Sequence, residues 1–161
     1  MTTRYTFSAY FISFFAIVVP VIIFLILYNI NIIFHNNMFY TVLYTAAMLV
    51  VEFILYTTLR TKVITVSINE TEISVKRFLG LGPEKKYRIK DLDGFHLSKI
   101  EIKRGYYDCI YIIYKNKKVA KVSNLYHDNY DYFLNRVEDH LKDLGFTESD
   151  FITELKDAFD F

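Results

Sequence analysis

Two long apolar runs in the first third of the chain limit the possible folds more than any other feature. Between Arg4 and Glu52 there is no Asp, Glu, Lys or Arg, and His35 is the only side chain that titrates near neutrality. A helix needs about 20 apolar residues to cross the hydrocarbon core of a bilayer, whereas a buried soluble helix rarely needs more than about 10–14. We therefore predict a hairpin of two membrane-spanning helices, at about 7–28 and 38–59.

The cations beside these runs predict how the hairpin is oriented. Arg4 precedes the first span, Arg60 and Lys62 follow the second, and the connector NINIIFHNN has none. Because Lys and Arg accumulate on the cytoplasmic side, we expect both termini and the rest of the chain in the cytoplasm. The single cysteine, Cys109, fits a reducing compartment. A cleaved signal peptide fits poorly, because the first apolar run is too long and no small-x-small site follows it.

Glu52 is a carboxylate inside the second predicted span. It lies about seven residues before the end of that span, or roughly 10 Å by helix rise. An acid at that depth should face protein or water, and its predicted partners are Tyr56, one turn on, and Ser13, at the facing depth of the first span. Two interpretations are open: a hydrogen-bonded clamp between spans or protomers, and a proton or ion relay.

Residues 61–145 read as one small domain whose first part alternates polar and apolar residues. KVITVSI and EISVKRFL predict a hairpin, and KYRI, FHLSKIEIK, CIYIIYK and VAKVS predict further strands between turns such as GLGPEKK. Consecutive antiparallel strands usually pair. We therefore predict an α+β domain: a small sandwich or barrel of about six to seven antiparallel strands.

A helical period replaces the alternation after the last predicted strand. In HDNYDYFLNRVEDHLKDLGF, apolar residues recur three and four apart and form one stripe, which predicts an amphipathic helix. Asp128 is its predicted N-cap, and Gly145 is the predicted left-handed residue at its end. A second, short acidic helix is predicted over residues 146–161, while the transmembrane hairpin fills residues 1–60.

Four segments then carry a likeness to a known family: VSINETEISVKRFLG, YRIKDLDGF, YIIYKNKKVAKVSN and NYDYFLNRVEDHL. Together with the two N-terminal spans, this layout resembles bacterial membrane proteins that carry a PH-like domain. The resemblance implies two sheets packed nearly orthogonally, with the amphipathic helix closing one open end. It transfers no site residues, and the acidic tail is a departure from the pattern.

The sequence holds few groups that fit catalysis or metal binding. The four histidines form no pair with metal-ligand spacing, and GLGP lacks the Lys-Ser/Thr of a phosphate loop. Cys109 is expected to pack in a strand, and Asp91 and Asp93 to form a turn. We therefore predict no catalytic residues, no metal and no cofactor, and a protein that is not an enzyme.

Charge is distributed unevenly along the soluble part. Residues 60–121 hold 15 Lys and Arg against 7 Asp and Glu, whereas residues 122–161 hold 3 against 10. A basic face beside an anionic leaflet gains about 1 kcal/mol for each nearby Lys or Arg. The alternative is an ordinary solvated surface in which lysines protect strand edges. The predicted basic patch, facing lipid or a partner, comprises Lys76, Arg77, Lys85, Lys86, Arg88 and Lys90.

The function predicted from these features is a membrane-anchored binding or scaffolding module in the bacterial inner membrane. It recruits a protein partner or contacts anionic lipid, and a homo-oligomer is also expected; nucleic acid is not, because the anchor holds the domain at the membrane. Two alternatives stay open. One is an accessory subunit of a transport or ion-motive complex in which the hairpin and Glu52 act, and the other is a membrane enzyme with an unrecognised site.

Overall fold

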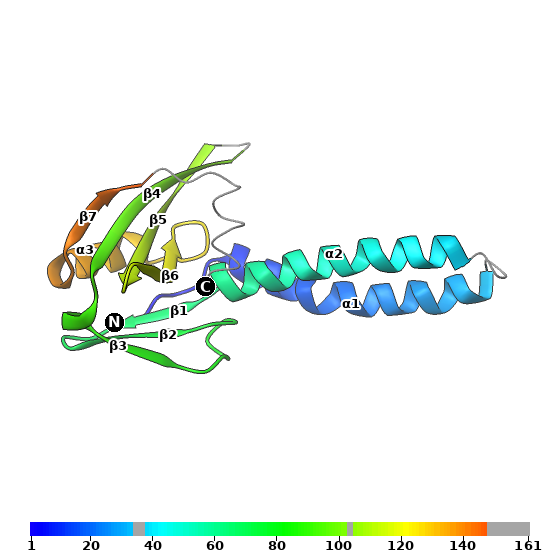
Figure 1. The fold of residues 1–161 in the computed structure, drawn as a ribbon, viewed down its shortest axis with the longest axis horizontal. Coiled ribbons are helices and arrows are strands. Elements are labelled where there is room, and N and C mark those ends of the chain that lie inside the picture. Colours follow the sequence, from blue (N-terminus) through cyan, green and yellow to red (C-terminus); the bar gives the residue numbers. More distant parts are fainter. Residues whose placement is uncertain (34–37, 103–104, 148–161) are drawn as a thin grey trace.

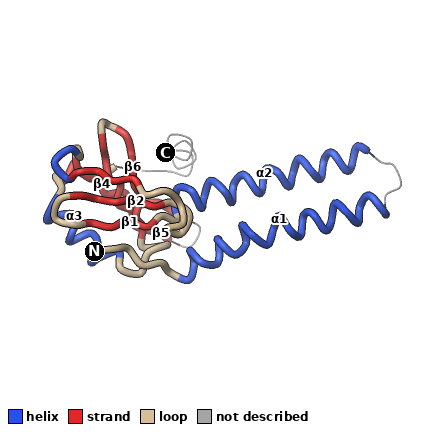
Figure 2. The backbone as a smooth tube through the Cα atoms, turned by 90° about the horizontal axis from the view of Figure 1, so that it is seen from below, coloured by secondary structure: helices blue, strands red, loops and turns tan. Residues whose placement is uncertain are grey.

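A pair of long helices projects from one end of a β-rich unit in the computed structural model, which describes residues 1–33, 38–102 and 105–147. Helix α1 covers Phe7–Ile33, and α2, which runs back toward the β-rich unit, covers Met38–Lys62. The two helices lie side by side and extend away from the sheets (Figure 1). The view turned by 90° shows the same arrangement (Figure 2).

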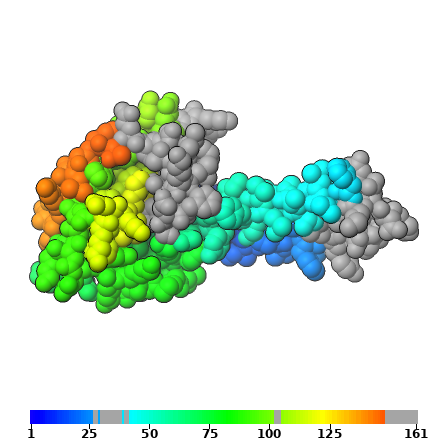
Figure 3. Space-filling view, viewed as in Figure 1, coloured from blue at the N-terminus to red at the C-terminus, as the bar shows by residue number. Residues whose placement is uncertain are grey.

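Both helices are long and apolar enough to cross a membrane, in the segments Phe7–Ile26 and Val42–Lys62. Their side chains are not used to build a soluble core, since Phe7 is 81% exposed and Leu49 is 66% exposed. In the space-filling view the pair stands clear of the β-rich unit (Figure 3). The two predicted spans are therefore confirmed as helices of sufficient length and apolarity, and their exposed apolar surface distinguishes them from the core helices of soluble proteins.

The soluble unit contains two sheets that share no strand. The first is antiparallel, in the order β1-β2-β3, with β1 at Thr65–Ile68, β2 at Glu72–Lys76 and β3 at Lys85–Arg88. The second has the order β6-β5-β4-β7, with β4 at Gly94–Ile102, β5 at Gly105–Tyr114, β6 at Lys117–Ser123 and β7 at Asp143–Phe146. A 3-10 turn at Ile89–Asp91 connects the sheets, and helix α3 at Tyr130–His140 follows β6.

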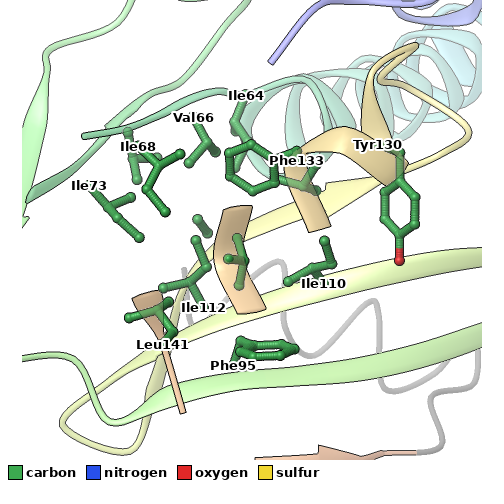
Figure 4. Close-up of a cluster of buried hydrophobic side chains, with 14 residues drawn as sticks. Ile64, Val66, Ile68, Ile73, Phe95, Ile110, Ile112, Tyr130, Phe133 and Leu141 are labelled. Atoms are coloured by element: carbon green, nitrogen blue, oxygen red, sulfur yellow. The ribbon is translucent and has the colours of Figure 1, made fainter. Parts of the chain in front are cut away.

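The main core lies between the two sheets and α3 (Figure 4). The predicted alternation decides which residues enter it, because every second residue of β1 and β2 is buried. Burial of each such side chain contributes about 1.5–3 kcal/mol. The buried members of this core are Ile64, Val66, Ile68, Ile73, Val75, Phe95, Ile110, Ile112, Ala120, Val122, Tyr130, Phe133, Val137 and Leu141.

The α+β class is confirmed, but two finer expectations are wrong. The sheets remain separate, so they do not close into a barrel. The strands are also not all antiparallel, since β7 pairs in parallel with β4. The parallel pairing follows from chain direction: α3 crosses the molecule and returns the chain to the free edge of β4.

The end of the amphipathic helix also differs from the prediction. Helix α3 ends at His140 because the backbone that follows it hydrogen-bonds to β4 instead: the Phe95 amide donates to the Lys142 carbonyl at 3.0 Å. Gly145 has a positive φ of 91° but lies within β7 rather than at the helix end. Asn129, not Asp128, occupies the N-cap position, and its side chain makes no capping bond. The predicted acidic helix over 146–161 lies outside the described residues, apart from Phe146, which ends β7, and Thr147, which follows it.

Candidate membrane-facing site

The six residues that precede α1 form an N-terminal segment that pairs with β1. The Thr3 amide donates to the Val66 carbonyl at 2.9 Å, and the Ile68 amide donates to the Met1 carbonyl at 2.7 Å. Tyr5 forms an isolated antiparallel β-bridge with His127, which follows β6. The predicted boundary at residue 60 assigned this segment to the hairpin, whereas its hydrogen bonds place it in the soluble unit. Both ends of the hairpin are therefore fixed to one domain.

Asn129 fastens the N-terminal segment to the start of α3. Its Oδ1 accepts a hydrogen bond from the Arg4 amide at 2.7 Å, and its Nδ2 donates to the Thr2 carbonyl at 3.0 Å. The Asp128 amide adds a third bond, to the Arg4 carbonyl, at 3.0 Å. This use of the Asn129 side chain explains why it does not cap α3.

His127 connects the sheets beneath the same segment. It is 1% exposed, its Nε2 lies 2.9 Å from the Ile64 carbonyl oxygen, and its Nδ1 lies 3.3 Å from the Ser123 amide nitrogen and 3.1 Å from the Ser123 carbonyl oxygen. Burial lowers the pKa of His127, although the nearby carbonyls of Ile64 and Ser123 oppose that shift. The neutral ring is therefore the form that suits the folded state.

A small apolar cluster joins the base of the hairpin to the domain. Ala9 of α1, Val63 just after α2 and Tyr126 are buried together, and Leu59 and Leu79 pack against them. Leu79 belongs to the turn between β2 and β3, so this turn lies beside the end of α2. We call this end of the soluble unit the helix-proximal end.

The six residues of the predicted basic patch divide between the two ends of the first sheet. Lys76 pairs with Thr65, the residue where β1 begins after α2, and Lys85 pairs with Val75, so both lie at the helix-proximal end. Lys86 and Arg88 follow along β3 and form ion pairs, with Glu72 at 3.3 Å and with Asp91 at 2.7 Å. Lys90 lies beyond them in the 3-10 turn. The register thus places Lys76, Arg77 and Lys85 at the helix-proximal end of the sheet, with Lys76 and Lys85 on opposite faces, whereas Lys86, Arg88 and Lys90 lie progressively farther from the hairpin.

Arg77 is the most closely packed cation of the patch. Burial lowers its pKa, and the charge of Arg60 in the last turn of α2 lowers it further. Two guanidinium groups near one another repel, and an anion beside them relieves that repulsion. Arg60 and Arg77 therefore both bring positive charge to the helix-proximal end.

Among the described residues, Oε2 of Glu52 makes no hydrogen bond to either predicted partner, Ser13 or Tyr56. The Ser13 hydroxyl donates to the Ala9 carbonyl of its own helix at 2.7 Å. The Tyr56 ring lies against Phe78 of the β2–β3 turn, with centroids 5.5 Å apart. Within the part of the chain that the structure describes, Oε2 of Glu52 is buried and has no hydrogen-bond partner.

Groups with catalytic or metal-binding potential are sparse. The described residues contain no cluster of three or more His, Cys, Asp or Glu side chains that could hold a metal ion. Cys109 is fully buried, and burial raises the pKa of its thiol to about 11 despite the opposing charge of Lys121. Asp91 and Asp93 lie in the connection before β4, as expected for a turn.

Two open pockets, of about 440 and 600 Å³, border the N-terminal segment and include none of the six patch residues.

Three features of this site were not predicted from the sequence: the pairing of residues 1–3 with β1, the fastening role of Asn129, and the position of the β2–β3 turn beside α2. MTTRYT has no clear strand alternation, and its hydrogen bonds to β1 and to Asn129 depend on the tertiary fold. The apolar letters of RFLGLGP were a usable signal, because turns exposed to water seldom contain three large apolar side chains.

Comparisons with known proteins place no further constraint on this site. A scan against protein-family models and searches of curated proteins and of solved structures each find no match.

Proposed function

We propose that this protein is a membrane-anchored binding module. The α1–α2 hairpin crosses the bacterial inner membrane, and a PH-like domain lies at its cytoplasmic face, where it contacts anionic lipid and presents its outer surface to a protein partner. The observation that carries the proposal is the double attachment of the hairpin. On one side residues 1–3 pair with β1, and Tyr5 and Thr6 bond to the segment after β6; on the other side α2 leads directly into β1. Such an anchor keeps the domain at the bilayer surface and raises its effective concentration for partners there.

The charge at the helix-proximal end supports lipid as the first ligand. Lys76, Arg77 and Lys85 lie where the domain meets the hairpin, and each cation near an anionic leaflet contributes about 1 kcal/mol. Three such residues favour the docked domain by about 3 kcal/mol, or on the order of 100-fold in the docking equilibrium. Salt weakens this attraction, because exposed charges are screened.

The test compares two triple charge reversals that change net charge equally. The first replaces Lys76, Arg77 and Lys85 by Glu. The matched control replaces by Glu three lysines away from the helix-proximal end: Lys90 in the 3-10 turn, and Lys115 and Lys117 at the β5–β6 turn. Full-length protein is placed in nanodiscs of neutral or partly anionic lipid, and amide hydrogen exchange is measured across β2 and β3.

We expect anionic lipid to slow exchange at the helix-proximal end of β2 and β3 in the unchanged protein and in the control, but not in the first variant. The slowing should weaken as salt is raised. Equal slowing in both variants, or none in the unchanged protein, would remove anionic lipid as the ligand.

A second candidate function is an accessory role in a membrane transport or ion-motive complex. The observation that favours it is Glu52, whose buried Oε2 has no partner among the described residues. A buried unpaired carboxylate oxygen is costly, so another polypeptide or a second copy would supply the donor. Glu52→Gln keeps the shape and the hydrogen-bonding capacity but removes the charge. Normal insertion and assembly with loss of function would favour this role, whereas unchanged function would leave the carboxyl a hydrogen-bonding group.

A further inference from the structure

The geometry points to the β2–β3 turn, residues 78–82, as a second membrane contact: its apolar tip, Leu81, enters the interface of the bilayer that the hairpin crosses. This inference rests on the proposed function, since it needs α1 and α2 to span that bilayer. It adds a specific segment, a depth and a lipid contact that is apolar as well as charged.

The depth of the turn follows from its contact with α2. Phe78 lies against Tyr56, with ring centroids 5.5 Å apart. Tyr56 precedes Lys62, the last residue of α2, by six positions, which corresponds to about 9 Å along the helix axis. The contact between Phe78 and Tyr56 therefore places the start of the turn beside the last turns of α2. If Val42–Lys62 spans the bilayer, the turn lies at interface depth.

The turn exposes an apolar side chain at its tip. Leu81 is 87% exposed, the highest value among the large apolar side chains of the described residues. Leu79, two residues earlier, packs instead against the small apolar cluster of Ala9, Val63 and Tyr126 at the base of the hairpin. Exposing a leucine of this size to water forgoes about 1.5–3 kcal/mol that burial would contribute. Lipid beside α2 provides that burial, because the hairpin already holds the turn against it.

The conformation of the turn is fixed rather than adaptable. Phe78, Leu79 and Gly80 all have positive φ values, of 52°, 56° and 82°, which are unfavourable for side-chain-bearing residues. The Leu79 amide donates to the Val63 carbonyl at 3.0 Å, and the Gly82 amide donates to the Arg77 carbonyl at 2.9 Å. These bonds hold the strained backbone of the turn and place Leu81 at its tip.

Cations flank the apolar tip on both sides. Lys76 and Arg77 precede the turn, and Lys85 follows it after the carboxylate of Glu84, so three cations against one acid lie near the point where the tip leaves the domain. An apolar side chain bordered by Lys and Arg matches the composition of an anionic bilayer interface, with acyl chains beneath and phosphates around them. A groove on a protein partner would also bury Leu81, but it would not explain why the turn lies beside α2.

The test uses the fact that the chain contains no tryptophan. Three single-tryptophan variants of the full chain are compared in nanodiscs with and without brominated lipid: Leu81→Trp in the turn, Phe14→Trp in α1 and Tyr132→Trp in α3. All three positions are at least 60% exposed, so the substitutions disturb no packed core. Bromine quenches tryptophan fluorescence only at contact distance, and bromines placed near the headgroup or near the chain end report depth.

We expect Phe14→Trp to be quenched, Tyr132→Trp to remain unquenched, and Leu81→Trp to be quenched most by bromines near the headgroup. If Leu81→Trp behaves like Tyr132→Trp while Phe14→Trp is quenched, the turn does not enter lipid and this inference fails, but the anchored domain stands. If Phe14→Trp is also unquenched, the proposed membrane anchor itself fails. Quenching of Leu81→Trp that disappears when a protein partner is added would assign the tip to that partner.

Discussion

Removal of the Asn129 side chain is expected to release the N-terminal segment from the domain. Asn129→Ala eliminates the bonds from the Arg4 amide at 2.7 Å and to the Thr2 carbonyl at 3.0 Å. Each such bond contributes about 1 kcal/mol net, so the segment loses about 2 kcal/mol of local stability. A loss of that size raises local opening on the order of 30-fold.

Hydrogen exchange of the full chain in detergent micelles measures this opening directly. The amides to follow are those of Thr3, which donates to the Val66 carbonyl, and Thr6, which donates to the Tyr126 carbonyl. Both should exchange on the order of 30-fold faster in Asn129→Ala, while the amides of the sheets change little.

Asn124→Ala is the matched control. Its Oδ1 accepts its bond from the Asp108 amide of β5, at 3.2 Å, rather than from the N-terminal segment. Exchange at Thr3 and Thr6 should be unchanged in this variant. Unchanged exchange at these amides in Asn129→Ala would refute the reasoning that Asn129 fastens the segment.

Two further predictions concern the stability of the soluble unit. Gly94→Ala should destabilise the full chain by about 3–4 kcal/mol, because φ is +145° and the added Cβ would lie 2.2 Å from the Lys142 carbonyl oxygen. Gly145→Ala, with φ +91° and no atom within 4 Å, should cost only about 1–2 kcal/mol; equal losses in denaturant unfolding would contradict the parallel placement of β7. The lowered pKa of His127 predicts that melting temperature falls as pH drops below about 6.5, since the unfolded chain then binds the proton that the folded chain excludes. The change of melting temperature with pH should be smaller in His127→Gln and unchanged in His140→Gln. An equal change in the two variants and the unchanged protein would contradict the role given to His127.

Local patterns in the sequence were sufficient to predict the two helices and most strands. The spans follow from hydropathy alone, because no charge interrupts them before Glu52. The hairpin of β1 and β2 follows from strict alternation, and its observed register pairs Val66 with Val75 and Ile68 with Ile73. Each of these elements depends on interactions between residues near in sequence.

The missed features depend on interactions that join distant parts of the chain. LKDLGF continues the apolar spacing of α3, so Leu144 reads as part of the helix, although the free edge of β4 recruits it into β7. The predicted basic patch had the right composition, but only the strand register distinguishes Lys85 at the helix-proximal end from Arg88 at the other. Glu52 was singled out correctly as unusual, yet its expected partner Ser13 bonds within its own helix.

The account requires that the hairpin cross the bilayer while residues 1–6 and the sheets stay together on one side. Single cysteines placed in a Cys109→Ala background at Thr2, Asn36 and Tyr132 test this in bacterial cells with a membrane-impermeant maleimide. We predict that Asn36→Cys, in the connector, is labelled on intact cells, whereas Thr2→Cys and Tyr132→Cys are labelled only after lysis. Labelling of Tyr132→Cys on intact cells, or opposite behaviour of Thr2→Cys and Tyr132→Cys, would contradict the account.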